Sequence, residues 1–185
     1  MRKLIHLISA TVCLYALPVF GQSDPLATET KQSYERIKRN FIAAAEKMPE
    51  EHYGFQATPD VRSFGGHVAH IADSQMRSCS NYNGAVKQAD AGSMTAKADL
   101  VAAIKASFAE CDKAYNSLTD ANGAEMIAGR RGERSRYGTL NGNVTHANEV
   151  YGSMAVYLRL KGVVPPSSEG RAGGRGKGAR KKAGG

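Results

Sequence analysis

Several patterns that mark familiar chemistry are missing from this sequence. It has no glycine-rich phosphate loop, no Cys-x-x-Cys pair and no Gly-x-Ser-x-Gly signature. These absences argue against a phosphate-loop nucleotide enzyme, a dithiol redox protein and a hydrolase with a nucleophile elbow. Apolar and polar residues also fail to alternate over the length of a strand, so a sheet-based fold is not indicated.

The chain is long enough for one sizeable core and short for two ordinary domains, with 185 residues of which 42% are hydrophobic. Its net charge of +8 is concentrated at the ends: residues 1–21 carry +2 and residues 167–185 carry +5, which leaves +1 for residues 22–166. The tail has no aromatic residue on which a base could stack. We therefore expect no specific nucleic-acid recognition, only salt-sensitive contact of the tail with anionic surfaces.

The N-terminal segment is predicted to be a cleaved secretory signal. Arg2 and Lys3 precede an apolar stretch over residues 4–20, and a Val-Phe-Gly border stands before Gln22. The stretch is shorter than the roughly 20 mostly apolar residues that a transmembrane helix needs. Cys13 lies inside it, so a lipid anchor is not indicated. We predict a secreted or periplasmic protein.

Four segments show the three- and four-residue spacing of apolar side chains that is typical of amphipathic helices. These positions include Tyr34, Ile37, Phe41, Ala45 and Met48; Phe64, Val68, Ile71, Ala72 and Cys79; Leu100, Ile104, Phe108, Cys111, Tyr115 and Leu118; and Leu140, Val144, Ala147, Tyr151, Met154 and Leu158. Pro49 ends the first helix, while Ser63 and Thr95 are predicted N-caps of the second and third. A loop is predicted over residues 81–94, and Gly162 is predicted to end the fourth helix.

This pattern predicts an all-α protein, a four-helix bundle, because the apolar stripe of each helix can be buried only against the others. The chain then divides into a signal peptide over residues 1–21, the bundle over 22–166 and a tail over 167–185. The tail is rich in Gly, Arg and Lys and has no apolar anchor, so it is predicted to be disordered. A small-molecule ligand and a homodimer are both compatible with such a bundle.

Histidines on two predicted helices are the candidate metal ligands. His67 and His70 lie one turn apart on the second helix, and His146 lies on one flank of the fourth. Val150 shares that flank, and Glu149 lies further round the helix. Imidazoles from two facing helices can meet at the edge of the core, which is how helix bundles build metal sites.

Several stretches resemble the secreted branch of the DinB-like, damage-inducible family. They are MPEEHYGF at 48–55, RSFG at 62–65 running into HIAD at 70–73, HANEVYG at 146–152 and YLRLKGVVPPSS at 157–168. The resemblance implies a four-helix bundle that holds a divalent metal through one histidine of the second helix and a His-x-x-x-His pair of the fourth. His70 and His146 correspond to the first two ligands, and Val150 stands at the third.

Valine cannot coordinate a metal, so the site that the resemblance implies is degenerate. Two histidines alone bind zinc or nickel weakly. His67 from one turn earlier, or the carboxylate of Glu149, could substitute for the missing ligand. We expect a divalent metal, Zn or Ni, to be weakly bound or absent.

The resemblance allows two classes of function. The favoured one is an exported DinB-like domain with a degenerate metal site that serves as a non-catalytic binding or structural module. The alternative is a divalent-metal-dependent thiol transferase or hydrolase that uses His70 and His146, since a metal acidifies a bound thiol or water. Whether the protein is an enzyme is left open at this point.

Two cysteines of the mature chain, Cys79 and Cys111, fall on core-facing positions of the second and third predicted helices. In an exported protein they are expected to form a single disulfide, with two buried free thiols as the alternative.

The segment over residues 130–136 holds four arginines. Their guanidinium groups could bind an anion through paired hydrogen bonds, but a solvated, mobile loop is the favoured interpretation.

Overall fold

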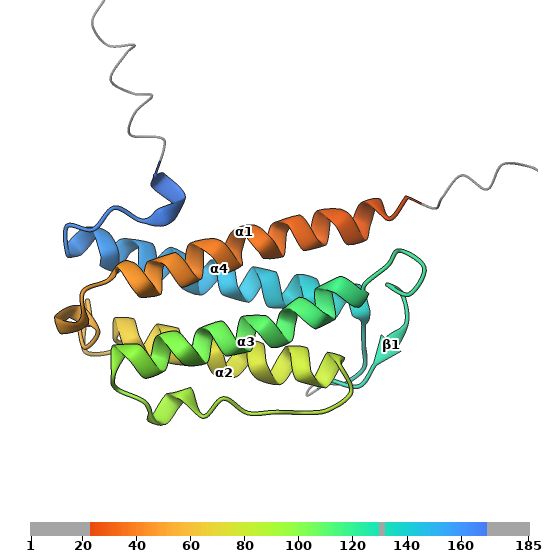
Figure 1. Ribbon diagram of the computed structural model, residues 1–185, viewed down its shortest axis with the longest axis horizontal. Helices are drawn as coiled ribbons and strands as arrows, with labels where there is room; N and C mark the ends of the chain where they lie inside the picture. Colours follow the sequence, from red (N-terminus) through yellow and green to blue (C-terminus); the bar gives the residue numbers. More distant parts are fainter. Residues whose placement is uncertain (1–22, 130–131, 170–185) are drawn as a thin grey trace, which may run out of the picture.

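Four helices build the protein, in a computed structural model that describes residues 23–129 and 132–169. They are α1 (Pro25–Lys47), α2 (Phe64–Tyr82), α3 (Lys97–Ser117) and α4 (Arg136–Leu160) (Figure 1). The all-α bundle predicted from the apolar spacing is confirmed.

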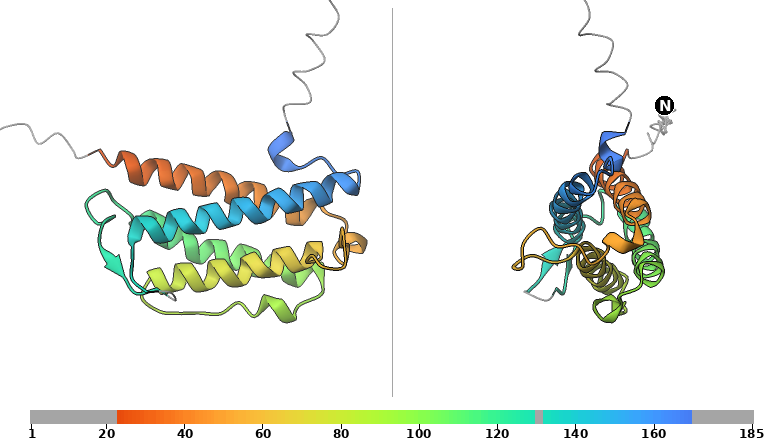
Figure 2. Two further views of the ribbon diagram at one scale, coloured as in Figure 1. Left: turned by 180° about the vertical axis from the view of Figure 1, so that it is seen from behind. Right: turned by 90° about the vertical axis from the view of Figure 1, so that its left-hand side faces the viewer.

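The helices occupy the corners of a square, in which α1 and α2 each pack against both α3 and α4 (Figure 2). Their predicted stripes form the core, where Phe41, Phe64 and Phe108 are fully buried. Tyr34 of α1 stacks on Tyr115 of α3 with 3.8 Å between ring centroids. The core is therefore continuous through all four helices, and the site described below lies on one side of it, between α2 and α4.

The ends of two helices follow local sequence signals. Ser63 caps α2, because its Oγ accepts a hydrogen bond from the Gly66 amide at 3.0 Å. Gly162 ends α4 with φ of +72°, and the Val163 amide donates to the Leu158 carbonyl at 2.8 Å, as in a Schellman motif. Both predictions are confirmed.

The prediction of Thr95 as the N-cap of α3 is wrong. The N-cap is Ala96, which makes no side-chain cap hydrogen bond. Instead, Lys97 Nζ donates to the carbonyls of Glu46 and Met48 at the end of α1, at 2.8 Å each. A contact with another helix, rather than a local cap, sets the start of α3.

The connection between α2 and α3 runs back along α2 (Figure 1). It is shorter at its start than predicted, since α2 continues to Tyr82, and it contains the short 3-10 helix η2 (Ala91–Ser93). The Asp73 carboxylate of α2 accepts hydrogen bonds from the Ala91 and Gly92 amides at 2.8 and 3.1 Å. These bonds hold the connection against the outer face of α2.

A two-stranded hairpin precedes α4 and has no counterpart among the predicted elements. Strands β1 (Met126–Ile127) and β2 (Arg134–Ser135) pair in antiparallel fashion. Two residues are too few to show a period-two pattern, which is why the apolar spacing did not reveal them. The hairpin forms one rim of the cleft described below.

The described chain ends in the 3-10 helix η3 (Pro166–Ser168), and another short 3-10 helix, η1 (Glu50–His52), follows α1. Residues of the predicted tail contact the bundle: the Ser167 amide donates to Tyr151 Oη at 3.0 Å, and Glu169 pairs with Lys47. The rest of that tail and the predicted signal peptide lie outside the described residues. In the part of the chain that the structure describes, no helix has both the length and the apolar character that crossing a membrane requires.

Candidate functional site

His70 of α2 and His146 of α4 face each other at the edge of the core. Their Nε2 atoms lie 3.0 Å apart, and the ring planes are nearly perpendicular, at 89°. At this distance the N–H of one imidazole donates a hydrogen bond to the unprotonated nitrogen of the other. The structure thus brings together the two residues that the resemblance to the DinB-like family identified as ligand positions.

The surroundings of His70 favour its neutral form. Burial lowers the pKa of the His70 imidazole, and the Arg62 guanidinium and the His146 ring lower it further. A neutral imidazole has one nitrogen free to accept a hydrogen bond or to coordinate a metal. His70 and His146 are therefore the residues that would hold a metal ion here, since their Nε2 atoms lie 3.0 Å apart.

The third ligand position does not supply a donor. Val150 lies one turn beyond His146 on α4, and its side chain is buried, with 8% of its surface exposed. Within the described ranges, no group of three or more His, Cys, Asp or Glu side chains is placed to hold a metal ion. The residues present therefore do not fit the three-histidine set that the resemblance implies.

His67 does not join the histidine pair. Its ring lies edge-on to the Tyr157 ring, with centroids 5.4 Å apart, and its buried Nδ1 has no hydrogen-bond partner among the described residues. Burial lowers the pKa of His67, and Arg62 and His70 contribute to the same effect. His67 is thus placed against α4 at Tyr157, on a different contact from that of His70.

Glu149 lies on the opposite side of the His146 ring from His70. Its Oε2 is 3.7 Å from His146 Nδ1, whereas Nε2 is the nitrogen that faces His70. Four-fifths of the Glu149 side chain is exposed. At 3.7 Å the carboxylate makes no hydrogen bond to the His146 ring, and it is not at the point where the two Nε2 atoms meet.

A disulfide between Cys79 and Cys111 joins α2 to α3, with 4.9 Å between the Cα atoms, so the predicted pairing is confirmed. Two polar side chains that the sequence analysis missed pack against it. The Nδ2 group of Asn143 on α4 donates to Gln75 Oε1 on α2 and lies 3.3 Å from Cys79 Sγ.

A sequence signal for these two residues was available. Gln75 falls midway between Ile71 and Cys79, and Asn143 falls between Leu140 and Ala147, so both occupy positions of an apolar stripe. Both are buried. Polar residues at such positions indicate a buried polar pair, because an unpaired polar group in a core is costly.

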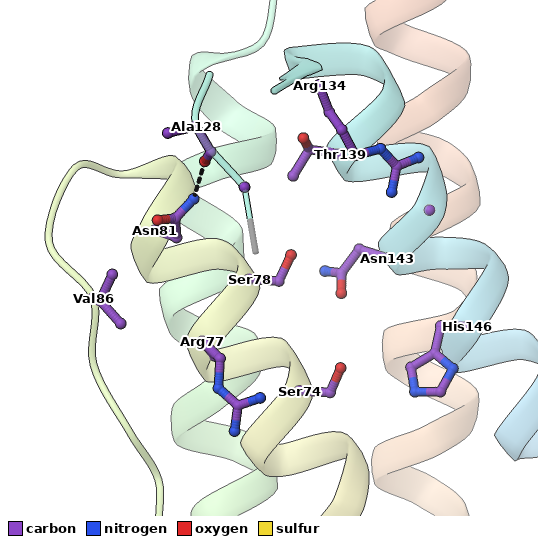
Figure 3. Close-up of a pocket in the computed structure, with 12 residues that line it drawn as sticks. Ser74, Arg77, Ser78, Asn81, Val86, Ala128, Arg134, Thr139, Asn143 and His146 are labelled. Atoms are coloured by element: carbon purple, nitrogen blue, oxygen red, sulfur yellow. Dashed lines mark hydrogen bonds between the residues drawn. The ribbon is translucent and has the colours of Figure 1, made fainter. Parts of the chain in front are cut away.

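A cleft of about 560 Å³ opens beside His146, between α2, the hairpin and α4 (Figure 3). Its lining includes hydroxyl, amide and guanidinium groups, from Ser74, Arg77, Ser78, Asn81, Arg134, Thr139 and Asn143. Asn81 Nδ2 donates to the Ala128 carbonyl at 2.8 Å, which ties the hairpin side of the cleft to α2. Among the described residues that line it, none is acidic.

The arginine-rich segment before α4 is divided between ordered elements. Arg134 lies in β2 and lines the cleft, and Arg136 is the first residue of α4. The Arg136 guanidinium pairs with Glu125 at 2.8 Å and lies over the Tyr82 ring. The interpretation of this part as a solvated, mobile loop is therefore wrong for these two residues, whereas Arg130 and Arg131 lie outside the described residues.

Comparison with known proteins identifies the family. Residues 33–152, more than half of the chain, match the family model described as the DinB superfamily. The crystal structure of a DinB-like protein from Bacillus cereus ATCC 10987 is similar, with 15% identity and a TM-score of 0.65 over 75% of this chain and 95% of that chain. A conserved protein from Enterococcus faecalis has 13% identity and a TM-score of 0.58 over 72% of this chain and 95% of its own. No match is found among curated proteins. The chain therefore belongs to the DinB superfamily.

Proposed function

We propose that this chain is an exported DinB-like module that binds a small molecule beside the His70–His146 pair and has lost metal-dependent catalysis. The observation that carries the proposal is the buried valine at position 150, where a third nitrogen donor would be needed. Zinc sites of lasting occupancy usually have three or four protein ligands. Two imidazoles would hold zinc or nickel only weakly.

The cleft beside His146 supports a binding role. Small-molecule sites in proteins commonly enclose roughly 300–1,000 Å³, and this cleft encloses about 560 Å³. Since His146 is part of its lining, a ligand in the cleft would contact one ring of the histidine pair. The pair would then serve as a hydrogen-bonding group of the binding site.

Export is supported by the N-terminal sequence and by the Cys79–Cys111 disulfide, since such bonds persist in oxidising compartments. The proposed location is secreted or periplasmic. Mass spectrometry of protein recovered from the cell envelope or the medium should give an N-terminus near Gln22. Intact Met1 on cytoplasmic protein would contradict export.

The alternative function is a divalent-metal-dependent thiol transferase or hydrolase. It is favoured by the separation of 3.0 Å between the two Nε2 atoms, which brings two nitrogen donors together. In that case His70 and His146 would hold the ion, and the chemistry it supplies when bound is acidification of a thiol or of water.

Metal analysis of the purified protein, followed by calorimetric titration with Zn²⁺ and Ni²⁺, separates the two functions. The module function predicts substoichiometric metal after purification and weak binding in the titration. His146→Ala serves as the matched variant, since it removes one of the two nitrogens. One tightly bound ion per chain in the wild type, lost in His146→Ala, would favour the enzyme.

A further inference from the structure

We propose that the cleft binds an anionic small molecule, a carboxylate or a phosphate, whose charge is met by the guanidinium groups of Arg77 and Arg134 at two ends of the cleft (Figure 3). The inference rests on the proposed function and names the class of ligand that the module binds. Arg77 reaches the cleft from α2, and Arg134 reaches it from β2 (Figure 3).

Among the described residues, no carboxylate balances the charge of the two arginines in the cleft. Within residues 23–129 and 132–169, neither Arg77 nor Arg134 forms an ion pair, whereas Arg136 nearby is paired with Glu125. No described residue of the lining is a carboxylate. Guanidinium groups present fixed, paired donors that match the oxygens of a carboxylate or phosphate, so an anion is the ligand that would complete them.

The Arg134 guanidinium packs against two glycines of α4. A Cβ atom added at Gly142 would lie 3.2 Å from Arg134 Nη1 and 3.3 Å from Nη2, so the guanidinium would have to move by a few tenths of an ångström. At Gly138, one turn earlier, the nearest atom of Arg134 would be Nε at 3.8 Å. Glycine is unfavourable inside a helix, and here its lack of a side chain lets the guanidinium lie directly against α4.

Three hydroxyl groups also line the cleft. Ser74 and Ser78 lie one turn apart on α2, and Thr139 lies on α4 across the cleft (Figure 3). In the described part of the chain, none of these three hydroxyls makes a side-chain hydrogen bond with the protein. At about 560 Å³ the cleft is far larger than a phosphate ion, so the ligand would be a larger molecule whose anionic groups lie within reach of Arg77 or Arg134.

The test is calorimetric titration of the purified protein with glycerol 3-phosphate and with citrate at constant ionic strength, with glycerol as the neutral probe. These two anions distinguish a phosphate ligand from a carboxylate ligand. We expect one or both anions to bind, and glycerol not to bind. Arg77→Gln and Arg134→Gln should each weaken binding by about tenfold or more, whereas Arg39→Gln, an exposed arginine of α1, should leave it unchanged. Unchanged affinity in the double variant of Arg77 and Arg134 would overturn the inference.

Two glycine substitutions on α4 test the contact between Arg134 and Gly142 without removing the charge of Arg134. Gly142→Ala should move the guanidinium by a few tenths of an ångström and weaken anion binding. Gly152→Ala is the matched control, because a Cβ there meets nothing within 4 Å. Both variants should unfold at or above the wild-type temperature, since alanine favours a helix. Wild-type affinity in Gly142→Ala would show that anion binding does not depend on the contact between Arg134 and Gly142.

Titration with and without EDTA distinguishes failure of this inference from failure of the proposed function. Anion binding that survives EDTA and depends on the arginines supports the proposed anion site. Binding that requires added Zn²⁺ and does not depend on the arginines would overturn both, because the anion would then sit on a metal. Absence of binding by every anionic probe would overturn the anion site and leave the proposed function standing.

Discussion

The two faces of α2 are stabilised in different ways. Toward α3, the Cys79–Cys111 disulfide joins the helices, and Asn83 just after α2 donates to the carbonyl and the carboxylate of Glu110 at 3.1 and 2.8 Å. Toward α4, the described contacts include the His70–His146 pair and the Gln75–Asn143 hydrogen bond, and the cleft opens beside them. One face is closed and the other is partly open.

This difference shows how the bundle can present a site without losing its core. Because the disulfide joins α2 to α3, the backbone of α2 is held in place, and it positions the side chains on the opposite face of the helix. Ser74, Arg77 and Ser78 then line the cleft from a rigid element, which is the arrangement that precise binding requires. The following predictions test this division of α2 into a closed and an open face.

The largest effect is expected from removing the disulfide on the closed face. The sequence separation of the two cysteines is 32, for which loop-closure entropy predicts a loss of roughly 3–4 kcal/mol in the free energy of unfolding for Cys79→Ala with Cys111→Ala. Urea denaturation measures the loss. A reducing agent should destabilise the wild type by a similar amount and leave the double variant unaffected. A loss well below about 1 kcal/mol would show that the closed face does not depend on the disulfide.

On the open face, Val150→His should create a third nitrogen donor near His70 and His146. Without metal, the larger polar ring is expected to cost on the order of 1 kcal/mol in the free energy of unfolding. With Zn²⁺ or Ni²⁺ at one hundred times the dissociation constant, binding to the folded state should restore about 2.7 kcal/mol. Thermal unfolding and titration of both proteins, with and without metal, provide the measurement.

The control for this prediction is the same substitution combined with His146→Ala, which should lose the metal-dependent gain. Tight binding of one ion by the wild type would show that Val150 is not a missing ligand. Absence of binding by Val150→His would show that the three side chains do not converge.

Asn143 marks the boundary between the buried and the open part of the α2–α4 contact. Asn143→Ala leaves the buried Gln75 Oε1 without this donor, so a loss of about 2 kcal/mol in unfolding free energy is expected. His146→Ala, one turn later on α4, should cost less than about 1 kcal/mol, because 36% of the His146 side chain is exposed. Chemical denaturation compares the two variants, and equal losses would remove the distinction.

The smallest effect concerns pH on the closed face. Hydrogen bonds from Lys113, Asn83 and Lys87 lower the pKa of Glu110 to about 2, from an ordinary value of 4.5. A carboxylate with a lowered pKa stabilises the fold above its ordinary pKa, and this contribution is lost as the pH falls through the folded-state value. The free energy of unfolding should therefore fall between about pH 5 and pH 2.

Glu110→Gln should flatten this dependence by about 1 kcal/mol, a modest amount because the two lysines are half-exposed or more and their attraction is screened by solvent. Denaturation at a series of pH values measures the slope. Glu149→Gln, an exposed carboxylate on the open face, is the matched control and should leave the slope unchanged. An equal slope in Glu110→Gln and the wild type would contradict the role of Glu110.

Local patterns predicted the helices well, because the residues buried on one face of a helix recur every three or four positions in the sequence. Phe41, Ile71 and Phe108 each fall on a predicted stripe and are buried. The start of α3 was missed because Lys97 is positioned by carbonyls of α1, which no local signal reveals. The hairpin was missed because its strands are too short for alternation.

The sequence by itself determined which side chains can do chemistry. His70 and His146 can donate a nitrogen to a metal or a hydrogen bond and Val150 cannot, since donor chemistry belongs to the residue wherever it lies. Only the tertiary structure decided which groups meet. It places the His67 ring against Tyr157 rather than in the His70–His146 pair, and it brings Arg77 and Arg134 to one cleft from elements far apart in the chain. Contacts between side chains of different elements depend on how the helices pack and on where a short hairpin folds. Neither can be predicted from the spacing of residues along one segment.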